Sequence, residues 1–318
     1  MARPTTIRKT TSPTVARRVI DCAAPDDMLT DWPVADAIRE SDTAMALIAD
    51  LGDGWMLAGA DLDGREWDID TEDRVITVDT AGLTPCALAR SKHFQNLLIL
   101  RTLGALRAAW QAERGEDALF MHRIDLWPLL GRIVAADTAV MTLRMVHEIR
   151  DAGFDAAWRH VLGDDHGDMA AEYVRTFDAA PDDDAPALGR AFLHWFKKPA
   201  RLRASDFEIL ALMDENLANL THDGRGTLGE GAIRCLTIDP LSGGSYLGPV
   251  AGEIAGNPAW RSIADPVAEA HFAQIMDEIG TTRVGHVALR DSRLAARLFP
   301  GHCAPAAGVD ADPDLCVK

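Results

Sequence analysis

The run from Lys92 to Glu113 constrains the fold more than any other part of the sequence, because it predicts a helix that is apolar on almost every side. At about 100° per residue, its aliphatic and aromatic side chains occupy three separate arcs. A few polar residues interrupt these arcs: Gln95, Asn96, Thr102, Arg107 and Gln111. A helix with so little polar surface belongs inside a core, so we expect the other elements to pack around it.

The surrounding sequence predicts an α+β fold, predominantly helical with one small antiparallel sheet. Short β-prone runs at Trp55–Ala58, Arg65–Ile69 and Val75–Val78 are separated by turn-forming residues. One amphipathic helix is predicted before them, between Asp31 and Gly52. After the sheet, the periodicity predicts helices near 92–113, 118–127, 128–152, 154–162, 168–178, 186–198 and 206–219.

Composition divides the chain into four parts. Residues 1–27 are expected to be a flexible basic tail, and residues 28–220 the main α+β domain. A stretch rich in glycine and proline begins after 220 and predicts a small helical C-terminal unit over 221–299. Residues 300–318 are expected to be a second flexible tail.

Charge and composition exclude several classes of protein. The net charge is −17, although residues 1–20 carry five basic residues and no acid. A body this acidic repels phosphate backbones, so no nucleic acid is expected as a partner. The chain has no apolar run long enough for a membrane span and no secretory signal, and its five cysteines are scattered. These features predict a soluble, cytoplasmic protein.

A resemblance emerges from the order of three segments: "WDIDTEDRVITVD" before the apolar helix, "TLGALRAAWQ" on it, and "AADTAVMTLRMVHEIRDAGFDAAWRHVLGDDHGDMA" after it. A hairpin followed by a central helix of the form Leu-Ala-His-Glu-Leu-x-His-Ala-Trp-Gln is the layout of small zincin-like metallopeptidases. Over roughly residues 55–215 the chain resembles a bacterial family of predicted metallopeptidases of unknown function. The resemblance implies a zincin-like core.

The resemblance also implies a degenerate active site. In zincins, two histidines at i and i+4 bind one zinc ion, and the glutamate after the first histidine is the general base. Those positions fall on Gly104, Ala105 and Ala108 in this chain. None of these residues can bind zinc or accept a proton. The same small residues are equally typical of a close helix contact in a packed core, with no metallopeptidase ancestry, and a shifted alignment that hides a working site is the third alternative.

Two charged residues near the degenerate motif are candidate binding residues. Asp137 has apolar helical neighbours on every side, so its carboxylate is expected to be paired or to ligate. In the zincin resemblance, the third, acidic ligand falls near Asp137, or on Ala135 if the register shifts. Arg101 is the charged residue closest to Gly104 by helical angle, and we therefore predict an internal Arg101–Asp137 ion pair.

Other metal-ligand candidates are weaker. His147 and Asp151 stand at i and i+4 in "HEIRD", which also suits a surface ion-pair face. The segment "HVLGDDHGD" contains His160 and His166, and its acids equally suit an N-cap for the following helix.

The leading functional hypothesis is a catalytically degenerate metallopeptidase-like protein, a pseudoenzyme that acts by binding an unknown protein or peptide partner. It requires no cofactor. The first alternative is an active metal-dependent hydrolase that uses unorthodox ligands and zinc. The second is a purely structural or assembly protein.

Overall fold

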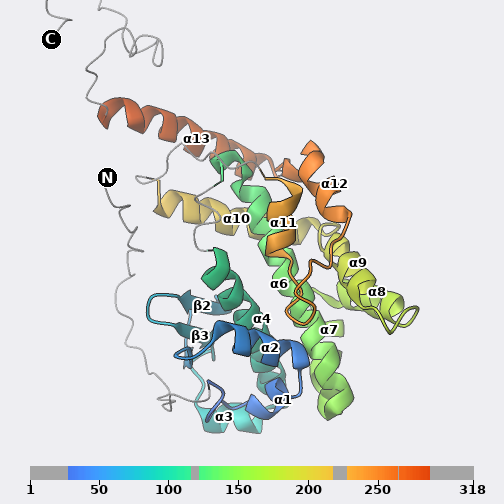
Figure 1. Ribbon diagram of the computed structural model, residues 1–318. Helices are drawn as coiled ribbons and strands as arrows, with labels where there is room; N and C mark the ends of the chain where they lie inside the picture. Colours follow the sequence, from blue (N-terminus) through green and yellow to red (C-terminus); the bar gives the residue numbers. More distant parts are fainter. Residues whose placement is uncertain (1–27, 116–121, 218–227, 264, 287–318) are drawn as a thin grey trace, which may run out of the picture.

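Helix α4 (Lys92–Gly115) lies at the centre of the N-terminal half, between a small sheet and the long helix α6 (Trp127–Ile149) (Figure 1). The computed structural model describes residues 28–115, 122–217, 228–263 and 265–286. Seven apolar side chains of α4 are buried: Leu98, Ile99, Leu103, Ala105, Leu106, Ala109 and Trp110. The predicted role of this helix as the centre of the core is confirmed.

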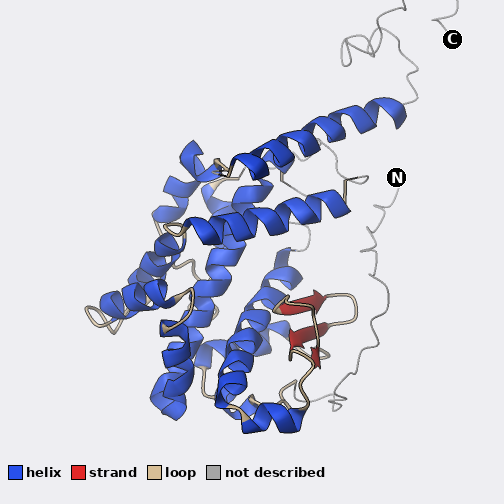
Figure 2. Ribbon diagram, turned by 180° about the vertical axis from the view of Figure 1, so that it is seen from behind, coloured by secondary structure: helices blue, strands red, loops and turns tan. Residues whose placement is uncertain are grey.

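The sheet has three short strands and lies on one side of the helical body (Figure 2). The strands are β1 (Met56–Ala60), β2 (Trp67–Asp70) and β3 (Val75–Asp79), in the order β1-β3-β2. β2 pairs antiparallel with β3, whereas β1 pairs parallel with β3. The α+β class is confirmed, and the sheet is mixed rather than antiparallel throughout, because the connection after β1 passes to the far side of β3 instead of forming a hairpin.

Two helices precede the sheet where the sequence predicted one. They are α1 (Ala35–Arg39) and α2 (Asp42–Leu51), with Ser41 between them in an extended conformation. The Ser41 hydroxyl accepts a hydrogen bond from the Ala44 backbone N–H, so the serine caps α2. This cap starts a new helix inside the amphipathic run.

Helices follow the sheet to the end of the described chain. They begin with α3 (Pro85–Arg90), α4, the short turn η1 (Ile124–Leu126) and α6. Next come η2 (Arg150–Phe154), α7 (Asp155–Leu162), α8 (Gly167–Phe177), α9 (Ala185–Trp195) and α10 (Pro199–Glu215). The predicted start of α10 at 206 is wrong, because Pro199 occupies its first turn, where proline is tolerated.

Helix α10 crosses α6 closely at Gly131. A Cβ built on this glycine would lie 2.2 Å from Cγ1 of Ile209. Arg132, the next residue, bonds both carboxylate oxygens of Asp206 on α10 at 2.7 Å. A glycine and a buried ion pair therefore fix the crossing point of the two helices.

The segment after residue 227 packs onto the same core as the N-terminal helices. It contains α11 (Glu230–Leu236), α12 (Val250–Gly256), η3 (Pro258–Arg261) and α13 (Pro266–His286). Leu228, Ile233, Tyr246 and Ile254 belong to the cluster of buried apolar residues that also includes α4 and α6. Within the described ranges, no helix is both long enough and apolar enough to cross a membrane.

Candidate functional site

The α4 positions that the resemblance assigns to zinc chemistry lie where α4 meets β2 and α6. Gly104 and Ala105 are buried, and Ala108 is half-buried. The Trp67 indole ring from β2 covers Gly104: a Cβ built there would lie 2.8 Å from Cζ3 of Trp67 and 3.5 Å from Oγ1 of Thr142. Glycine at this position allows an aromatic ring of the sheet to pack directly on the central helix.

These residues do not fit a zinc ion. Proteins bind zinc through thiolate, imidazole and carboxylate groups, and Gly104, Ala105 and Ala108 supply none of them. A histidine at 104 would also bring its Cβ into collision with Trp67. Among the residues that the structure describes, no three His, Cys, Asp or Glu side chains are grouped so that they could hold a metal ion.

Beyond Trp67, solvent reaches the small residues on the same side of the α4–α6 pair. The helices are antiparallel, since Gly104 lies against Thr142 while Gln111 accepts a hydrogen bond from Thr138 at 2.9 Å. Solvent exposure is intermediate for four alanines on this side: Ala108 and Ala112 on α4, and Ala135 and Ala139 on α6. We refer to these four residues as the alanine surface. It begins where the closed contact at Gly104 ends.

The predicted Arg101–Asp137 ion pair is wrong, because each residue has a different partner. Arg101 Nη1 lies 2.8 Å from Asp79 Oδ2 at the end of β3 and also donates to the Asp79 carbonyl oxygen. Asp137 Oδ2 instead accepts from Nε of Arg107, at 2.7 Å, and both side chains are fully buried. The expectation that Asp137 is paired is confirmed, and the cation is Arg107, six residues after the predicted Arg101 on α4.

Arg107 and Asp137 form the centre of a buried polar network that joins three segments. Asp137 also accepts hydrogen bonds from Gln111 at 2.5 Å and from the Tyr246 hydroxyl at 2.8 Å. Arg107 donates to the carbonyl oxygens of Leu236 and Ile238. The network thus ties α4 and α6 to the chain after α11. Arg107 and Gln111, four residues apart on an otherwise apolar helix, were the sequence signal for it.

Burial dominates the electrostatics of this network. Removal from water raises the pKa of the Asp137 carboxyl, while Arg107 and the hydrogen bonds from Tyr246 and Gln111 oppose the rise. The pKa of Tyr246 is raised well above its ordinary value, chiefly by burial and then by the nearby carboxylate. A neutral, hydrogen-bonded Tyr246 is therefore strongly favoured, and the group serves to hold Asp137 in place.

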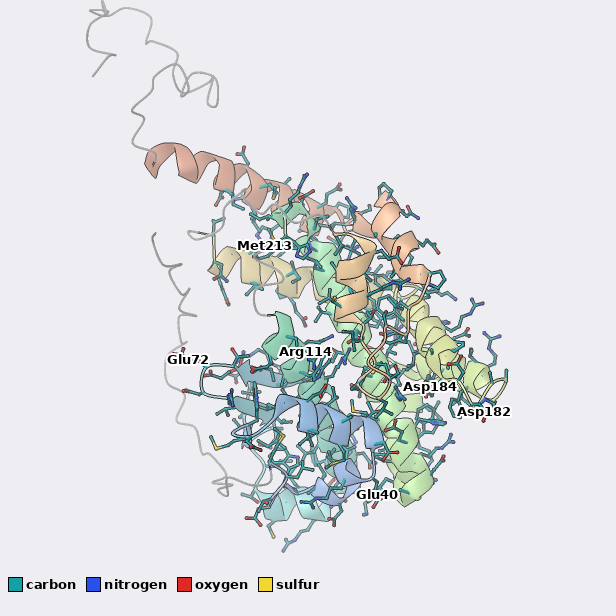
Figure 3. The ribbon with its side chains drawn as sticks, in the orientation of Figure 1. Glu40, Glu72, Arg114, Asp182, Asp184 and Met213 are labelled. Atoms are coloured by element: carbon teal, nitrogen blue, oxygen red, sulfur yellow. The ribbon has the colours of Figure 1, made fainter. Side chains whose placement is uncertain are left out.

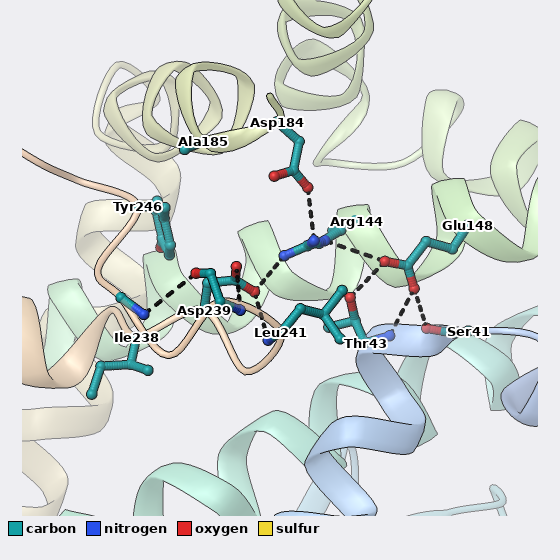
Figure 4. A network of polar contacts seen from close by, with 12 residues as sticks. Ser41, Thr43, Arg144, Glu148, Asp184, Ala185, Ile238, Asp239, Leu241 and Tyr246 are labelled. Carbon is teal, nitrogen blue, oxygen red and sulfur yellow. Dashed lines mark hydrogen bonds and ion pairs between the residues drawn. The ribbon is translucent and has the colours of Figure 1, made fainter. Parts of the chain in front are cut away.

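A second polar cluster surrounds Arg144 (Figure 4). Its guanidinium lies 2.5 Å from Asp239, 2.9 Å from Asp184 and 3.2 Å from Glu148. Glu148 in turn accepts from the hydroxyls of Ser41 and Thr43, at 2.6 and 2.5 Å. One arginine on α6 thereby links the start of α2, the start of α9 and the loop after α11.

The structure separates the weaker metal-ligand candidates. His147 is buried, so the predicted surface ion-pair face is wrong for this residue. Its ring centroid lies 5.0 to 5.3 Å from those of Trp158, Tyr173 and Phe177, and its Nε2 has no hydrogen-bond partner among the residues that the structure describes. Asp151 is exposed and pairs with its neighbour Arg150. This arrangement is typical of a structural histidine in an aromatic core.

The loop between α7 and α8 contains acids paired with cations rather than an N-cap. His160 packs against the ring of His93 on α4, and His166 precedes α8 without a side-chain capping bond. Asp165 pairs with Lys198, at 2.7 Å, and Asp168 pairs with Arg201. The predicted cap is wrong, because the basic start of α10 lies close enough to take both carboxylates.

Comparison with known proteins agrees with the resemblance over part of the chain. Residues 90–214 match the model of a family described as "Putative metallopeptidase family (DUF6782)". No curated protein and no solved structure matches the chain. The matched part runs from the start of α4 almost to the end of α10, so it includes Gly104, Ala105 and Ala108 but not the sheet. The family resemblance is confirmed for these residues, while the degenerate motif, the zincin-like core and the bacterial origin stay predictions.

Proposed function

We propose that the protein is a metallopeptidase-like pseudoenzyme that binds a peptide segment without hydrolysing it. The observation that carries this proposal is the contact between Trp67 and Gly104. It closes the place where the family resemblance expects the first zinc ligand, and it leaves no room for a longer side chain. Hydrolysis through that arrangement would need donor groups that this helix lacks.

The proposed binding surface consists of the alanine surface together with the free edge of β2. Within the described part of the chain, β2 pairs with one strand only, β3, so the backbone groups of its other side have no strand partner there. Small, half-exposed residues on α4, the helix on which β2 packs through Trp67, give an extended chain close access to the helices. Trp67 adds a half-exposed aromatic ring between the edge of β2 and the alanine surface.

A library of immobilised peptides tests this proposal, with the full-length chain as the probe. Ala108→Arg places a long charged side chain on the alanine surface, and Ala171→Arg places the same side chain on an exposed position of α8 as the matched control. We expect a subset of peptides to retain the wild type and the Ala171→Arg variant but not Ala108→Arg. Two results would contradict the proposal. One is cleavage of the peptides during incubation, and the other is equal retention of all three proteins.

A purely structural role is the second candidate, and the packing of Trp67 on Gly104 favours it directly. The two candidates differ in the expected behaviour of the alanine surface. A structural protein would show no peptide retention that depends on Ala108.

A further inference from the structure

The acidic residues of β2 are arranged to recognise one chemical class of peptide. Trp67 and Ile69 pack against the hydrophobic core, on the side of the strand that faces α4. Side chains alternate between the two faces of a strand. Glu66, Asp68 and Asp70 therefore share the opposite face, at intervals of two residues along the free edge.

The basic residues around the strand differ in their partners. Arg101 pairs with the carboxylate of Asp79, whereas Arg74 donates to the neutral carbonyl oxygen of Asp53 and keeps its positive charge. Arg65 lies 3.4 Å from Asp68, and the Arg65 side chain is largely exposed, so this pair holds the carboxylate weakly. The five acids between residues 66 and 73 outnumber Arg65 and Arg74, so the edge keeps an excess of negative charge.

Further acids from other segments reinforce this charge. Glu66 is exposed, yet the atoms around its carboxyl partly remove it from water and raise its pKa, which Arg101 opposes and the carboxylates of Asp164 and Glu208 raise further. Asp164 follows α7 and Glu208 lies on α10, so two distant parts of the chain contribute negative potential at the same strand. Glu72, in the turn after β2, lies at the outer end of the sheet (Figure 3).

We propose, building on the peptide binding proposed above, that the ligand is an extended segment of a partner protein with lysine or arginine at alternate positions, which adds as a strand to the free edge of β2. The backbone groups of the edge strand supply hydrogen bonds to an added strand. Basic side chains spaced by two residues then match the spacing of Glu66, Asp68 and Asp70, so each basic side chain of the added strand lies beside an acidic one of β2. An acidic segment would place like charges opposite one another and be rejected.

Three synthetic peptides of equal length test this inference by fluorescence anisotropy with the full-length chain. One alternates lysine and threonine, the second alternates glutamate and threonine, and the third is the lysine peptide with prolines at two threonine positions. We expect the lysine peptide to bind at least tenfold more tightly than the glutamate peptide. The proline peptide should bind more weakly than its parent, because proline removes backbone N–H groups that an added strand needs.

A charge-matched pair of double variants locates the binding. Asp68→Asn with Asp70→Asn removes two carboxylates from β2, and asparagine at 70 can still accept the bond from the Asp73 N–H. Asp178→Asn with Asp182→Asn removes two exposed carboxylates around the end of α8, and Figure 3 shows Asp182 on the opposite side of the molecule from Glu72. We expect about a three- to tenfold loss of affinity for the first variant and no change for the second.

Three kinds of result would overturn this inference, and each has a different explanation. Equal loss in both double variants, or no weakening by proline, would mean attraction to the net charge alone and would overturn the inference. Peptides in the library that depend on Ala108 but show no preference for basic residues would overturn it while leaving the proposed function intact. Binding of the lysine peptide only after Arg3, Arg8, Lys9, Arg17 and Arg18 are changed to glutamine would identify the chain's own basic segment as the occupant, and would also overturn it.

Discussion

At the residue scale, Gly104 and Ala108 differ although both are small residues on one face of α4. The indole ring of Trp67 fills the space beside Gly104, whereas solvent reaches Ala108. The sequence pattern predicted close packing for both positions alike. It could not distinguish them, because the ring that covers one of them comes from a strand more than thirty residues earlier.

This difference gives a paired prediction. Gly104→Leu should lower the free energy of unfolding by at least about 2 kcal/mol, since its side chain must displace Trp67. Ala108→Leu should change it by less than about 0.5 kcal/mol, because Ala108 is half-exposed and solvent reaches it. Urea unfolding measures both values. Adding Trp67→Ala to Gly104→Leu should recover part of the loss, and failure of that rescue would contradict the proposed contact.

The Arg107–Asp137 pair gives a second prediction at this scale. Arg107→Met leaves a buried carboxylate without its cation and should cost about 3–5 kcal/mol. The double variant Arg107→Met with Asp137→Leu removes both charges, so it should be more stable than the single variant. It should remain below the wild type, because Gln111 and Tyr246 lose their acceptor. Two single effects that simply add in denaturant titrations would refute the coupling.

Burial of His147 predicts a dependence of stability on pH. Burial, assisted by Arg150, lowers the pKa of this histidine below 6.5. The unfolded chain therefore takes up this proton at a higher pH than the folded chain does, and the free energy of unfolding should fall as pH drops through 6.5. His147→Phe, which suits the surrounding rings, should reduce this fall, whereas the exposed control His93→Phe should not. Identical pH profiles for the wild type and His147→Phe would rule out the explanation.

At the element scale, local patterns predicted most helices but not how the segments meet. Periodicity and breakers located α4 and α6 to α9 to within a few residues. They placed the start of α10 too late, because a proline commonly ends a helix, whereas Pro199 occupies the first turn of this one. The parallel pairing of β1 with β3 depends on contacts between distant residues, and no local signal reports such a pairing.

Ser41 both caps α2 and links this helix to α6. Its hydroxyl accepts from the Ala44 N–H and donates to Glu148 on α6. Ser41→Ala should cost more than the roughly 1 kcal/mol typical of a lost cap, since Glu148 also loses a hydrogen bond. Thr84→Ala removes a cap from α3 at an exposed site and is the matched control. Equal losses of melting temperature would show that the bond to Glu148 contributes nothing.

At the scale of the whole molecule, buried arginines on α4 and α6 hold the C-terminal segment against the N-terminal helices. Arg107 bonds the carbonyl oxygen of Ile238 after α11, Arg132 bonds those of Trp260 and Ser262, and Arg144 bonds Asp239. Sequence composition suggested a boundary near residue 221 but could not show these bonds, because each joins residues more than 90 positions apart. The sequence predicted the central helix of the candidate site and the small residues on it. It could not predict that Trp67 covers Gly104, because the two residues lie in separate elements.

The proposed function requires that α4 holds no catalytic zinc. Zinc content of the purified full-length chain, measured by elemental analysis after incubation with excess zinc and gel filtration, tests this requirement. We expect far less than one zinc ion per chain. Stoichiometric zinc that is retained through gel filtration, together with cleavage of peptides that a chelator abolishes, would contradict it.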